Sequence, residues 1–532
     1  MSHKYYKYFS ILAIVFMISC AKRGTINGGT KDSIGPVLKI SFPENYTTDF
    51  KGDEIRLTFD EYIKLKNINK QLIISPPMAK MPDISPQTAS KYIRIKFRDT
   101  LQANTTYSLN FGQSIEDNNE GNPYKQFKYV FSTGPYIDSL TLKGAIKDAY
   151  FKKAPSFVSV MLFEVNSKFK DSVVYKVHPR YITNTLDSAK TFQLENLKAG
   201  KYLLVALKDE NNNNKYDPKK ESIGFHNKYV TIPNDTIFEV ALFKQESAFV
   251  AVKPIQSSGN RLIMGYEGNP KDVNIVLKNN GEIIPSIVTK FEGKDSLQIW
   301  YKPIKTDSLL VNVTRDKYKQ DFVSRIKNQK NDSLKISVKQ GRMLPLREKL
   351  VLKSNTPLTG FDNSKMQLIN KDSTAVPFTS DYDIYKQELN IDFKREPVED
   401  YKMKLLPGAL TDFLEQKNDS LTFAFSTKNN SDYGNLKLTL ENVRQFPVIV
   451  ELTDAKGDVL TSAYSEGNTV VEFNLLEPRL YSVRVIYDEN KNKVWDSGNY
   501  LEKRQPEEVI YFLKEIDVRA NWDIDQVINL KQ

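Results

Sequence analysis

The chain has 532 residues, which is too many for one hydrophobic core, so we expect several domains. Its composition, 40% hydrophobic and 27% charged, excludes both a disordered chain and a multispanning membrane protein. The net charge is +11, but both signs alternate along the sequence without a basic block, which argues against a nucleic-acid partner.

The first twenty residues have the pattern of an export signal. Lys4 and Lys7 precede an apolar stretch at 9–18 that is too short to span a bilayer but suits a signal peptide. Residues 17–20, Met-Ile-Ser-Cys, resemble a bacterial lipobox with Met17 in place of the usual Leu. The resemblance implies cleavage before Cys20 and a diacylglycerol thioether there, with acyl chains such as palmitate holding the protein on a membrane. The alternative is a soluble secreted protein whose lone cysteine lies there by chance.

Residues 20–36 are polar, rich in Gly and without periodicity, which predicts a flexible tether. Beyond them, apolar residues alternate with polar ones in short runs, for example at 55–59, 93–97, 107–111 and 127–131. Pro, Gly, Asn and Asp separate these runs at intervals typical of antiparallel β-sandwiches. The sequence therefore predicts an all-β protein without long helices.

A pair of segments occurs twice in the same order. Tyr401 and the Phe-Ser-Thr at 425–427 follow Tyr107 and the Phe-Ser-Thr at 131–133 at an offset of 294 residues. At an offset of 279 residues, Phe192, Leu194, Leu197 and Tyr202 align with Val471, Phe473, Leu476 and Tyr481. We therefore predict a signal peptide (1–19), the tether (20–36) and five β-sandwich modules, which we name A1 (37–134), B1 (135–247), M (248–340), A2 (341–428) and B2 (429–532).

Two family resemblances support this division. Module A1 resembles bacterial Ig-like domains of the type named after S-layer proteins, through the motifs at 59–63, 101–107 and 131–134; A2 keeps only the later ones. Module B1 resembles the pre-albumin-like sandwiches of the carboxypeptidase-regulatory and collagen-adhesin-B types, through the pattern from Phe192 to Tyr202 that includes Gly200. Module B2 has Arg479 in place of that Gly. The whole chain is similar to Ig-like lipoproteins of Bacteroidota, a group whose biochemistry is poorly defined.

Two Asn-rich loops are candidate calcium sites, and calcium is the only cofactor that the sequence suggests. Oxygen-bearing side chains at loop positions 1, 3, 5 and 9 suit Ca²⁺, which takes 6–8 oxygens. Neither loop has the Gly and Glu of an EF-hand, although Glu221 and Glu502 lie nearby. The alternative is a hairpin loop whose Asx side chains cap their own backbone. The candidate ligands are Asp209, Asn211, Asn213 and Asp217, and Asp488, Asn490, Asn492 and Asp496.

The tripeptide Asp-Ser/Thr-apolar recurs along the chain and resembles the O-glycosylation signal of exported Bacteroidota proteins. The alternative is structural, because Asp-Ser also ends a turn before a strand begins. The candidate hydroxyl residues are Ser33, Thr100, Ser139, Ser172, Ser188, Thr236, Ser296, Ser308, Ser333 and Ser420.

Catalytic chemistry finds little support. One Cys and three His exclude a disulfide framework and a Cys-based zinc site, and no P-loop, GxGxxG, GxSxG or HExxH motif occurs. His178 and His226 stand alone, which is typical of surface or packing residues. We interpret the acidic pairs at 60–61 and 116–117 as solvated carboxylates. We therefore predict no catalytic residues and no enzyme.

These features together predict a lipid-anchored protein of the outer membrane that works by binding. We expect a structural or scaffold subunit of an envelope machine, such as one for barrel assembly, secretion or uptake, with envelope proteins as partners. The alternative is a surface adhesin that binds glycans, although the three tryptophans, Trp300, Trp495 and Trp522, are scattered. Whether the modules face the periplasm or the cell surface stays open.

Overall fold

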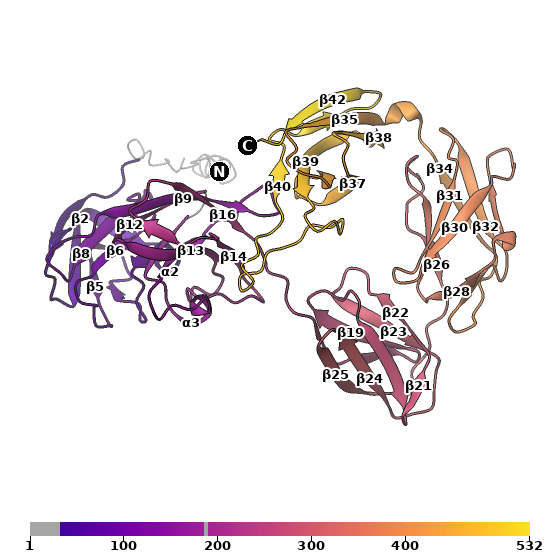
Figure 1. Ribbon diagram of the computed structural model, residues 1–532, viewed down its shortest axis with the longest axis horizontal. Coiled ribbons are helices and arrows are strands. Elements are labelled where there is room, and N and C mark those ends of the chain that lie inside the picture. Colours follow the sequence, from indigo (N-terminus) through magenta and orange to yellow (C-terminus); the bar gives the residue numbers. More distant parts are fainter. Residues whose placement is uncertain (1–31, 186–189, 532) are drawn as a thin grey trace, which may run out of the picture. The chain divides into compact units, whose positions relative to one another are not determined.

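The computed structural model describes residues 32–185 and 190–531. Strands make up 49% of it and helices 3%, so the predicted all-β class is confirmed (Figure 1). The described helices are single turns, α2 (Ile68–Gln71), α3 (Val173–Lys176), η1 (Asn363–Lys365) and η2 (Asn430–Asp432). None of the helices in this part of the chain has the length and apolar character needed to cross a membrane.

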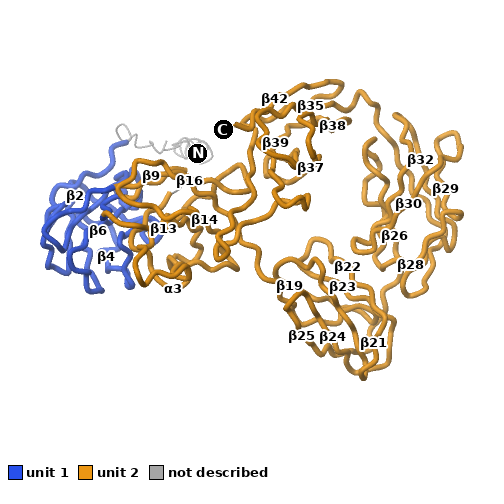
Figure 2. The backbone as a smooth tube through the Cα atoms, viewed as in Figure 1, with its two compact units in different colours: residues 1–140, 195–198 blue, residues 141–194, 199–532 orange. Residues whose placement is uncertain are grey.

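The chain divides into two compact units, residues 1–140 with 195–198, and residues 141–194 with 199–532 (Figure 2). The first unit contains two sheets, β1-β2-β5-β4 with β7 on β2, and β3-β6-β8. Alternation along β2 buries Ile55, Leu57 and Phe59 in the core and leaves Arg56 exposed. The strands are β1 (Leu38–Phe42), β2 (Glu54–Leu65), β3 (Ile73–Ser75), β4 (Asp83–Ser85), β5 (Ser90–Lys96), β6 (Thr106–Asn110), β7 (Ile115–Asp117) and β8 (Lys128–Ser132).

Module B1 contains the sheet β11-β10-β13-β14, with β15 on β13, and the sheet β12-β9-β16. Strand β13 is central, and residues 202–207 are all buried, since both of its faces are covered. Strands β9 and β16 pair in parallel. The strands are β9 (Leu140–Asp148), β10 (Ser159–Glu164), β11 (Tyr181–Asn184), β12 (Thr191–Leu197), β13 (Gly200–Lys208), β14 (Ser222–Phe225), β15 (Val230–Ile232) and β16 (Ile237–Leu242).

Module M has two antiparallel sheets, β17-β19-β23-β22 with β18 on β19, and β21-β20-β24-β25. Leu262, Leu277, Ile299 and Val311 are among the residues of its core. The strands are β17 (Val250–Ala251), β18 (Ile255–Ser258), β19 (Arg261–Glu267), β20 (Asn274–Asn279), β21 (Glu282–Ile284), β22 (Ser286–Lys290), β23 (Ser296–Tyr301), β24 (Ser308–Arg315), β25 (Tyr318–Arg325).

Module A2 has the sheets β26-β27-β31-β30, β29-β32-β34 and β28-β33. Leu352, Ile391, Met403 and Phe425 are among the residues of its core. The strands are β26 (Ile336–Val338), β27 (Leu350–Ser354), β28 (Leu358–Phe361), β29 (Met366–Ile369), β30 (Phe378–Asp383), β31 (Glu388–Phe393), β32 (Asp400–Leu405), β33 (Leu410–Asp412) and β34 (Leu421–Ser426).

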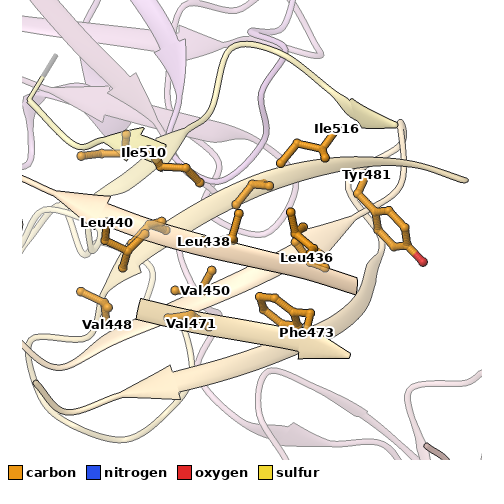
Figure 3. Packing of buried hydrophobic residues seen from close by; sticks show 14 of the residues in the cluster. Leu436, Leu438, Leu440, Val448, Val450, Val471, Phe473, Tyr481, Ile510 and Ile516 are labelled. Atoms are coloured by element: carbon orange, nitrogen blue, oxygen red, sulfur yellow. The ribbon is translucent and has the colours of Figure 1, made fainter. Parts of the chain in front are cut away.

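Module B2 repeats the strand order of B1. Its sheets are β37-β36-β39-β40, with β41 on β39, and β38-β35-β42, and β35 and β42 again pair in parallel. Figure 3 shows how Leu436, Leu438, Val450 and Phe473 pack in its core. The strands are β35 (Gly434–Glu441), β36 (Val448–Thr453), β37 (Val459–Ser465), β38 (Val470–Leu476), β39 (Arg479–Tyr487), β40 (Val509–Tyr511), β41 (Ile516–Val518) and β42 (Asp523–Asn529).

Candidate functional site

A dense polar site in the described chain surrounds Arg484, in the middle of β39. Its side chain is 0% exposed, although charged side chains are rarely fully buried unless they are paired. At the offset of 279 residues that relates the two copies, B1 has Val205 at the same position. The charge is therefore specific to B2, and it requires partners.

Three side chains supply these partners. Nε of Arg484 donates to Oε2 of Glu451 at 2.5 Å, Nη1 donates to the hydroxyl of Tyr511 at 3.0 Å, and Nη2 donates to the hydroxyl of Tyr150 at 2.5 Å. The hydroxyl of Tyr511 donates to the backbone carbonyl of Tyr150 at 2.8 Å. Burial acts to lower the pKa of Arg484, but Tyr511 and Glu451 outweigh that effect and raise it. Arg484 is therefore a buried cation, held between strands of B2 and the chain that follows β9 in B1.

Aromatic packing completes this contact. The guanidinium carbon of Arg484 lies 3.9 Å from the centroid of the Tyr150 ring, a cation–π arrangement. The ring of Tyr150 also lies 4.6 Å from that of Trp495. Gly457, with φ at +91°, leaves room for Phe151, whose ring would lie 3.0 Å from an added Cβ. We call this first contact between B1 and B2 the arginine clasp. It is formed by Tyr150, Glu451, Arg484, Trp495 and Tyr511.

A second contact between B1 and B2 surrounds Tyr500, which is 0% exposed. Its hydroxyl donates to the backbone carbonyl of Asp171 at 2.9 Å, and its backbone N–H donates to Oε1 of Gln245 at 3.1 Å. The ring packs edge-on against Phe225 at 5.3 Å, and Gln505 donates to the carbonyl of Phe225 at 2.9 Å. These contacts come from residues 497–505, which follow the second Asn-rich loop.

The segment with which B2 makes this second contact is longer than the equivalent segment of B1. Three residues separate Asp217 from Glu221 in B1, whereas ten separate Asp496 from Glu507 in B2. Glu221 and Glu507 are structurally equivalent, because each accepts two backbone N–H groups of its own loop. The seven additional residues of B2 therefore fall in the segment that contacts B1. The copies have diverged in sequence where they touch.

The first Asn-rich loop is closed by its own side chains. The two carboxylate oxygens of Asp209 accept the N–H groups of Asn213 and Asn214, at 3.2 and 2.7 Å. Asn211 and Asn213 each accept the N–H two residues further on, and so does Asp217. These are Asx turns.

The second loop repeats this arrangement. Asp488 accepts the N–H groups of Asn492 and Lys493, at 3.1 and 2.8 Å. The amides of Asn490 and Asn492 both donate to Oδ2 of Asp496, at 2.7 and 2.6 Å. The described residues contain no group of three Asp, Glu, His or Cys side chains placed to hold a metal ion. The loop geometry supports the Asx interpretation, and calcium binding by these loops stays a prediction.

Glu507, and not Glu502, accepts backbone N–H groups of the second Asn-rich loop. Glu502, which lies near the second loop in the sequence, pairs with Arg504 at 3.4 Å. Glu507 takes the place equivalent to Glu221, accepting the N–H of Glu489 at 2.8 Å and that of Asp496 at 3.0 Å. Burial raises the pKa of both Glu221 and Glu507. The inserted segment moved this residue away from the expected spacing.

The candidate glycosylation residues lie mostly at the surface. Several of them directly precede or begin a strand, as both the glycosylation and the structural interpretation allow. Ser33, Thr100, Ser139, Thr236, Ser333 and Ser420 are exposed, and Ser172, Ser296 and Ser308 are half-buried. Ser188 and the proposed lipidation site, Cys20, lie outside the described residues.

The interpretation of the second acidic pair as solvated carboxylates is wrong. Glu116 and Asp117 are buried. Glu116 pairs with Nζ of Lys66 at 2.8 Å. Burial acts to raise the pKa of Asp117, but N–H groups of the hairpin at 120–122 donate to its carboxylate and hold the pKa below its usual value. This aspartate closes a hairpin, and the equivalent Asp412 does the same in A2 by accepting two backbone N–H groups.

Neither histidine belongs to the arginine clasp, although His226 is the neighbour in sequence of Phe225, which takes part in the second contact. Nδ1 of His226 lies 2.8 Å from the carbonyl of Lys228, and its ring packs edge-on against Phe238 at 5.2 Å. His178 is half-buried, and burial together with Lys215 lowers its pKa. Among the described residues, neither imidazole is hydrogen-bonded to a carboxylate or a hydroxyl.

Two protein families match parts of the chain. A bacterial Ig-like domain family matches residues 32–133, which confirms the predicted Ig-like character of A1. A second family, described as an uncharacterized protein conserved in bacteria (DUF2141), matches residues 149–252 and so covers most of B1. No curated protein matches the chain.

Several solved structures align with long parts of the chain at low similarity. Domains 1–6 of the surface layer protein SbsC are 11% identical, over 91% of this chain and 67% of that one, with a TM-score of 0.15. The major pilin subunit BcpA of Bacillus cereus is 10% identical, over 74% and 99%, with a TM-score of 0.14. Immunoglobulin domains 1–5 of Sidekick-1 are 11% identical, over 94% and 100%, with a TM-score of 0.12. Likeness at this level carries no argument about function.

Proposed function

We propose that this protein is a lipid-anchored scaffold of the bacterial cell envelope, held on the outer membrane through Cys20 and working by binding other envelope proteins. The observation that carries the proposal is the pair of contacts between B1 and B2. The buried polar site around Arg484 joins two of the chain's own modules, and its residues are occupied in doing so. A bacterial Ig-like domain in A1 fits the same role.

The clasp gives the scaffold a defined geometry. Modules M and A2, residues 248–428, lie between B1 and B2 in the sequence, so the contacts between B1 and B2 close this segment into a loop of the chain. Neighbouring domains in a chain move relative to one another by default. A protein that consists of flexibly linked β-sandwiches would not require a contact of this kind between B1 and B2. A fixed arrangement is useful where several partners must be held at set positions, as in a machine for barrel assembly, secretion or uptake.

No specific observation in the described residues favours glycan binding, the alternative function. Carbohydrate sites usually present exposed aromatic rings, and the tryptophans were the best candidates. Trp300 is buried in M, and Trp495 belongs to the arginine clasp. Trp522 is 54% exposed, but Arg519 lies over its ring at 5.2 Å.

Affinity purification of the full chain from detergent-solubilised membranes tests the scaffold proposal. We expect defined envelope proteins to co-purify at a fixed ratio, and the clasp variant Arg484→Ala to lose some of them while staying on the membrane. Lys437→Ala, which removes only an exposed ion pair with Asp525, is the matched control. A protein that purifies alone and retains glycans on an array would support the adhesin instead.

We also infer that the exposed Asp-Ser/Thr-apolar sites carry O-glycans. The six exposed hydroxyl residues leave room for a sugar, whereas Ser296 and Ser308 lie at strand starts and are half-buried. Glycopeptide mass spectrometry of protein from its native membrane should therefore find sugars at Thr236 and Ser420 more often than at Ser296. Unmodified peptides at every site would leave only the turn-and-strand explanation.

A further inference from the structure

The first strand after the predicted tether carries apolar side chains that face solvent. Ile40 and Phe42, both on β1, are 66% and 76% exposed. Ile34, Val37 and Tyr46 are also exposed, so five large apolar side chains lie between residues 34 and 46. Scattered exposed apolar residues are ordinary, but a concentration of them indicates an interaction surface.

The strand register places Ile40 and Phe42 on one face of the sheet. Ile40 lies opposite Thr58, which lies opposite Tyr92 on β5, and Phe42 lies opposite Arg56. Directly opposed side chains of an antiparallel pair share a face. The other face buries Ile55, Leu57 and Phe59 in the core. Ile40, Phe42, Thr58, Arg56 and Tyr92 therefore form one outward surface, which we call the β1 face.

Several charged groups on and beside the β1 face are paired or stacked. The guanidinium of Arg56 lies 4.3 Å from the centroid of the Tyr92 ring. Arg94 pairs with Glu54 at 3.7 Å, and Arg98 pairs with Asp83. Asp60, on the same strand, accepts the N–H of Val37 at 2.8 Å. Arginine, tyrosine and phenylalanine beside aliphatic side chains are the combination that settles at the boundary between lipid headgroups and acyl chains.

The position of this surface in the sequence identifies what covers it. Eleven residues, 21–31, separate Cys20 from the first described residue, and such a segment spans at most about 40 Å when fully extended. A lipid on Cys20 would therefore hold β1 close to the leaflet that contains the anchor. The two chains of a diacylglycerol already suffice for stable attachment, so a contact made by β1 would orient the N-terminal unit and add to the affinity.

We propose that the β1 face lies against the lipid surface in which the protein is anchored, with Ile40 and Phe42 entering the headgroup region. This inference rests on the proposed lipid anchor at Cys20. It adds that the N-terminal unit is oriented on the membrane instead of moving freely on its tether.

The absence of any cysteine besides Cys20 provides a direct test. In the lipidated protein, Phe42→Cys supplies the one free thiol, which takes an environment-sensitive fluorophore. Ile237→Cys and Leu513→Cys are matched controls, since these residues are 77% and 81% exposed. Each labelled protein is reconstituted into vesicles of phosphatidylethanolamine and phosphatidylglycerol that contain a spin-labelled quenching lipid.

We expect the quenching lipid to quench the probe at 42 and to leave those at 237 and 513 almost unchanged. The mature chain with Cys20→Ala should still bind the vesicles weakly, and Ile40→Ser with Phe42→Ser should reduce this binding about tenfold. Equal fluorescence at all three sites in vesicle-bound protein would overturn the proposal. So would protection of the probe at 42 only in the presence of a co-purified protein partner. Failure of the lipidated chain to join the vesicles would instead count against the anchor.

Discussion

Arg484 and Tyr150 are 334 positions apart in the sequence, yet the guanidinium of one lies against the ring of the other at 3.9 Å. The first belongs to the second copy of a repeated module and the second to the first copy. Val205, the counterpart of Arg484, stays in the core of its own module. The two copies therefore share a fold, and Arg484 together with residues 497–505 joins B2 to B1.

Arg484→Ala should weaken the association of B2 with B1. The substitution removes the cation from a buried pair and leaves Glu451, which is 12% exposed, without it; breaking such a pair usually costs about 3–5 kcal/mol. Native-state hydrogen exchange of β39 and β40 measures the change locally, since a chain of several modules does not unfold in two states.

Two controls separate charge from packing in this experiment. Arg484→Leu with Glu451→Leu removes both charges and should recover a large part of the loss, because apolar replacement of a buried pair is often close to neutral. Arg94→Leu breaks an exposed ion pair with Glu54 and should cost at most about 1 kcal/mol. Unchanged exchange in Arg484→Ala would show that the clasp does not hold the modules together.

Tyr500→Ala should open the second contact. The ring is fully buried between Tyr175 and Phe225, and truncation of a buried aromatic residue costs about 3–5 kcal/mol. We expect rapid proteolysis within 497–505 in this variant. Leu501→Ala changes the next residue, which is 59% exposed, and should leave the cleavage rate as it is. Similar cleavage of the two variants would mean that Tyr500 does not secure the segment.

The fold class followed from alternation alone, because a sandwich strand with one buried face must repeat every two residues. Runs such as 55–59 and 93–97 satisfied that rule and became β2 and β5. The repeat at an offset of 279 residues also indicated that B1 and B2 share a fold, and the two modules have the same strand order. Helix content was predictable for the same reason, since no stretch had the spacing of an amphipathic helix.

The clasp was not predicted, although it left a trace in the sequence. Arg484 interrupts an apolar run that is unbroken in B1, and an unpaired charge in a buried strand implies a partner elsewhere. The sequence could not identify Tyr150 as that partner, because a contact across 334 positions has no local pattern. The burial of Asp117 was not predicted for a related reason, since it depends on the hairpin that closes over this residue.

Asp117 should make the stability of A1 depend on acidity. Its folded-state pKa lies below the usual 3.8, so the unfolded chain binds a proton more readily than the folded one. The stabilisation is complete well above pH 3.8 and is lost as the pH falls through the folded-state pKa. Acid unfolding followed by tyrosine fluorescence should therefore be less steep in Asp117→Asn than in the natural protein.

Glu61 supplies a control of opposite sign. Burial, with Asp117 and Asp60 nearby, raises its pKa, so its contribution is lost as the pH rises through the folded-state value. Glu61→Gln should make acid unfolding slightly steeper. If both variants shift the acid transition in the same direction, a general change in stability is responsible and the assignment to Asp117 fails.

Calcium should raise the melting temperature of the full chain if the Asn-rich loops bind it. Saturation at one hundred times the dissociation constant is worth about 2.7 kcal/mol, which corresponds to a shift of a few degrees in a domain of this size. Asp209→Ala with Asp217→Ala, and Asp488→Ala with Asp496→Ala, should each remove part of the shift. Because these variants also lose Asx turns, only the increment on adding Ca²⁺ is informative, and equal shifts with Mg²⁺ or none at all would leave the loops as self-capped turns.

Cys20→Ala should release the protein from the membrane. The apolar stretch at 9–18 is too short to remain as a stable span, so attachment of the mature chain depends on the acyl groups that the thiol accepts. The natural protein should incorporate labelled palmitate and enter the detergent phase, whereas Cys20→Ala should incorporate none and stay unprocessed or soluble. Ser19→Ala keeps a small residue before the cysteine and should mature normally. Normal processing and detergent partitioning of Cys20→Ala would place the anchor elsewhere and remove the basis for an oriented β1 face.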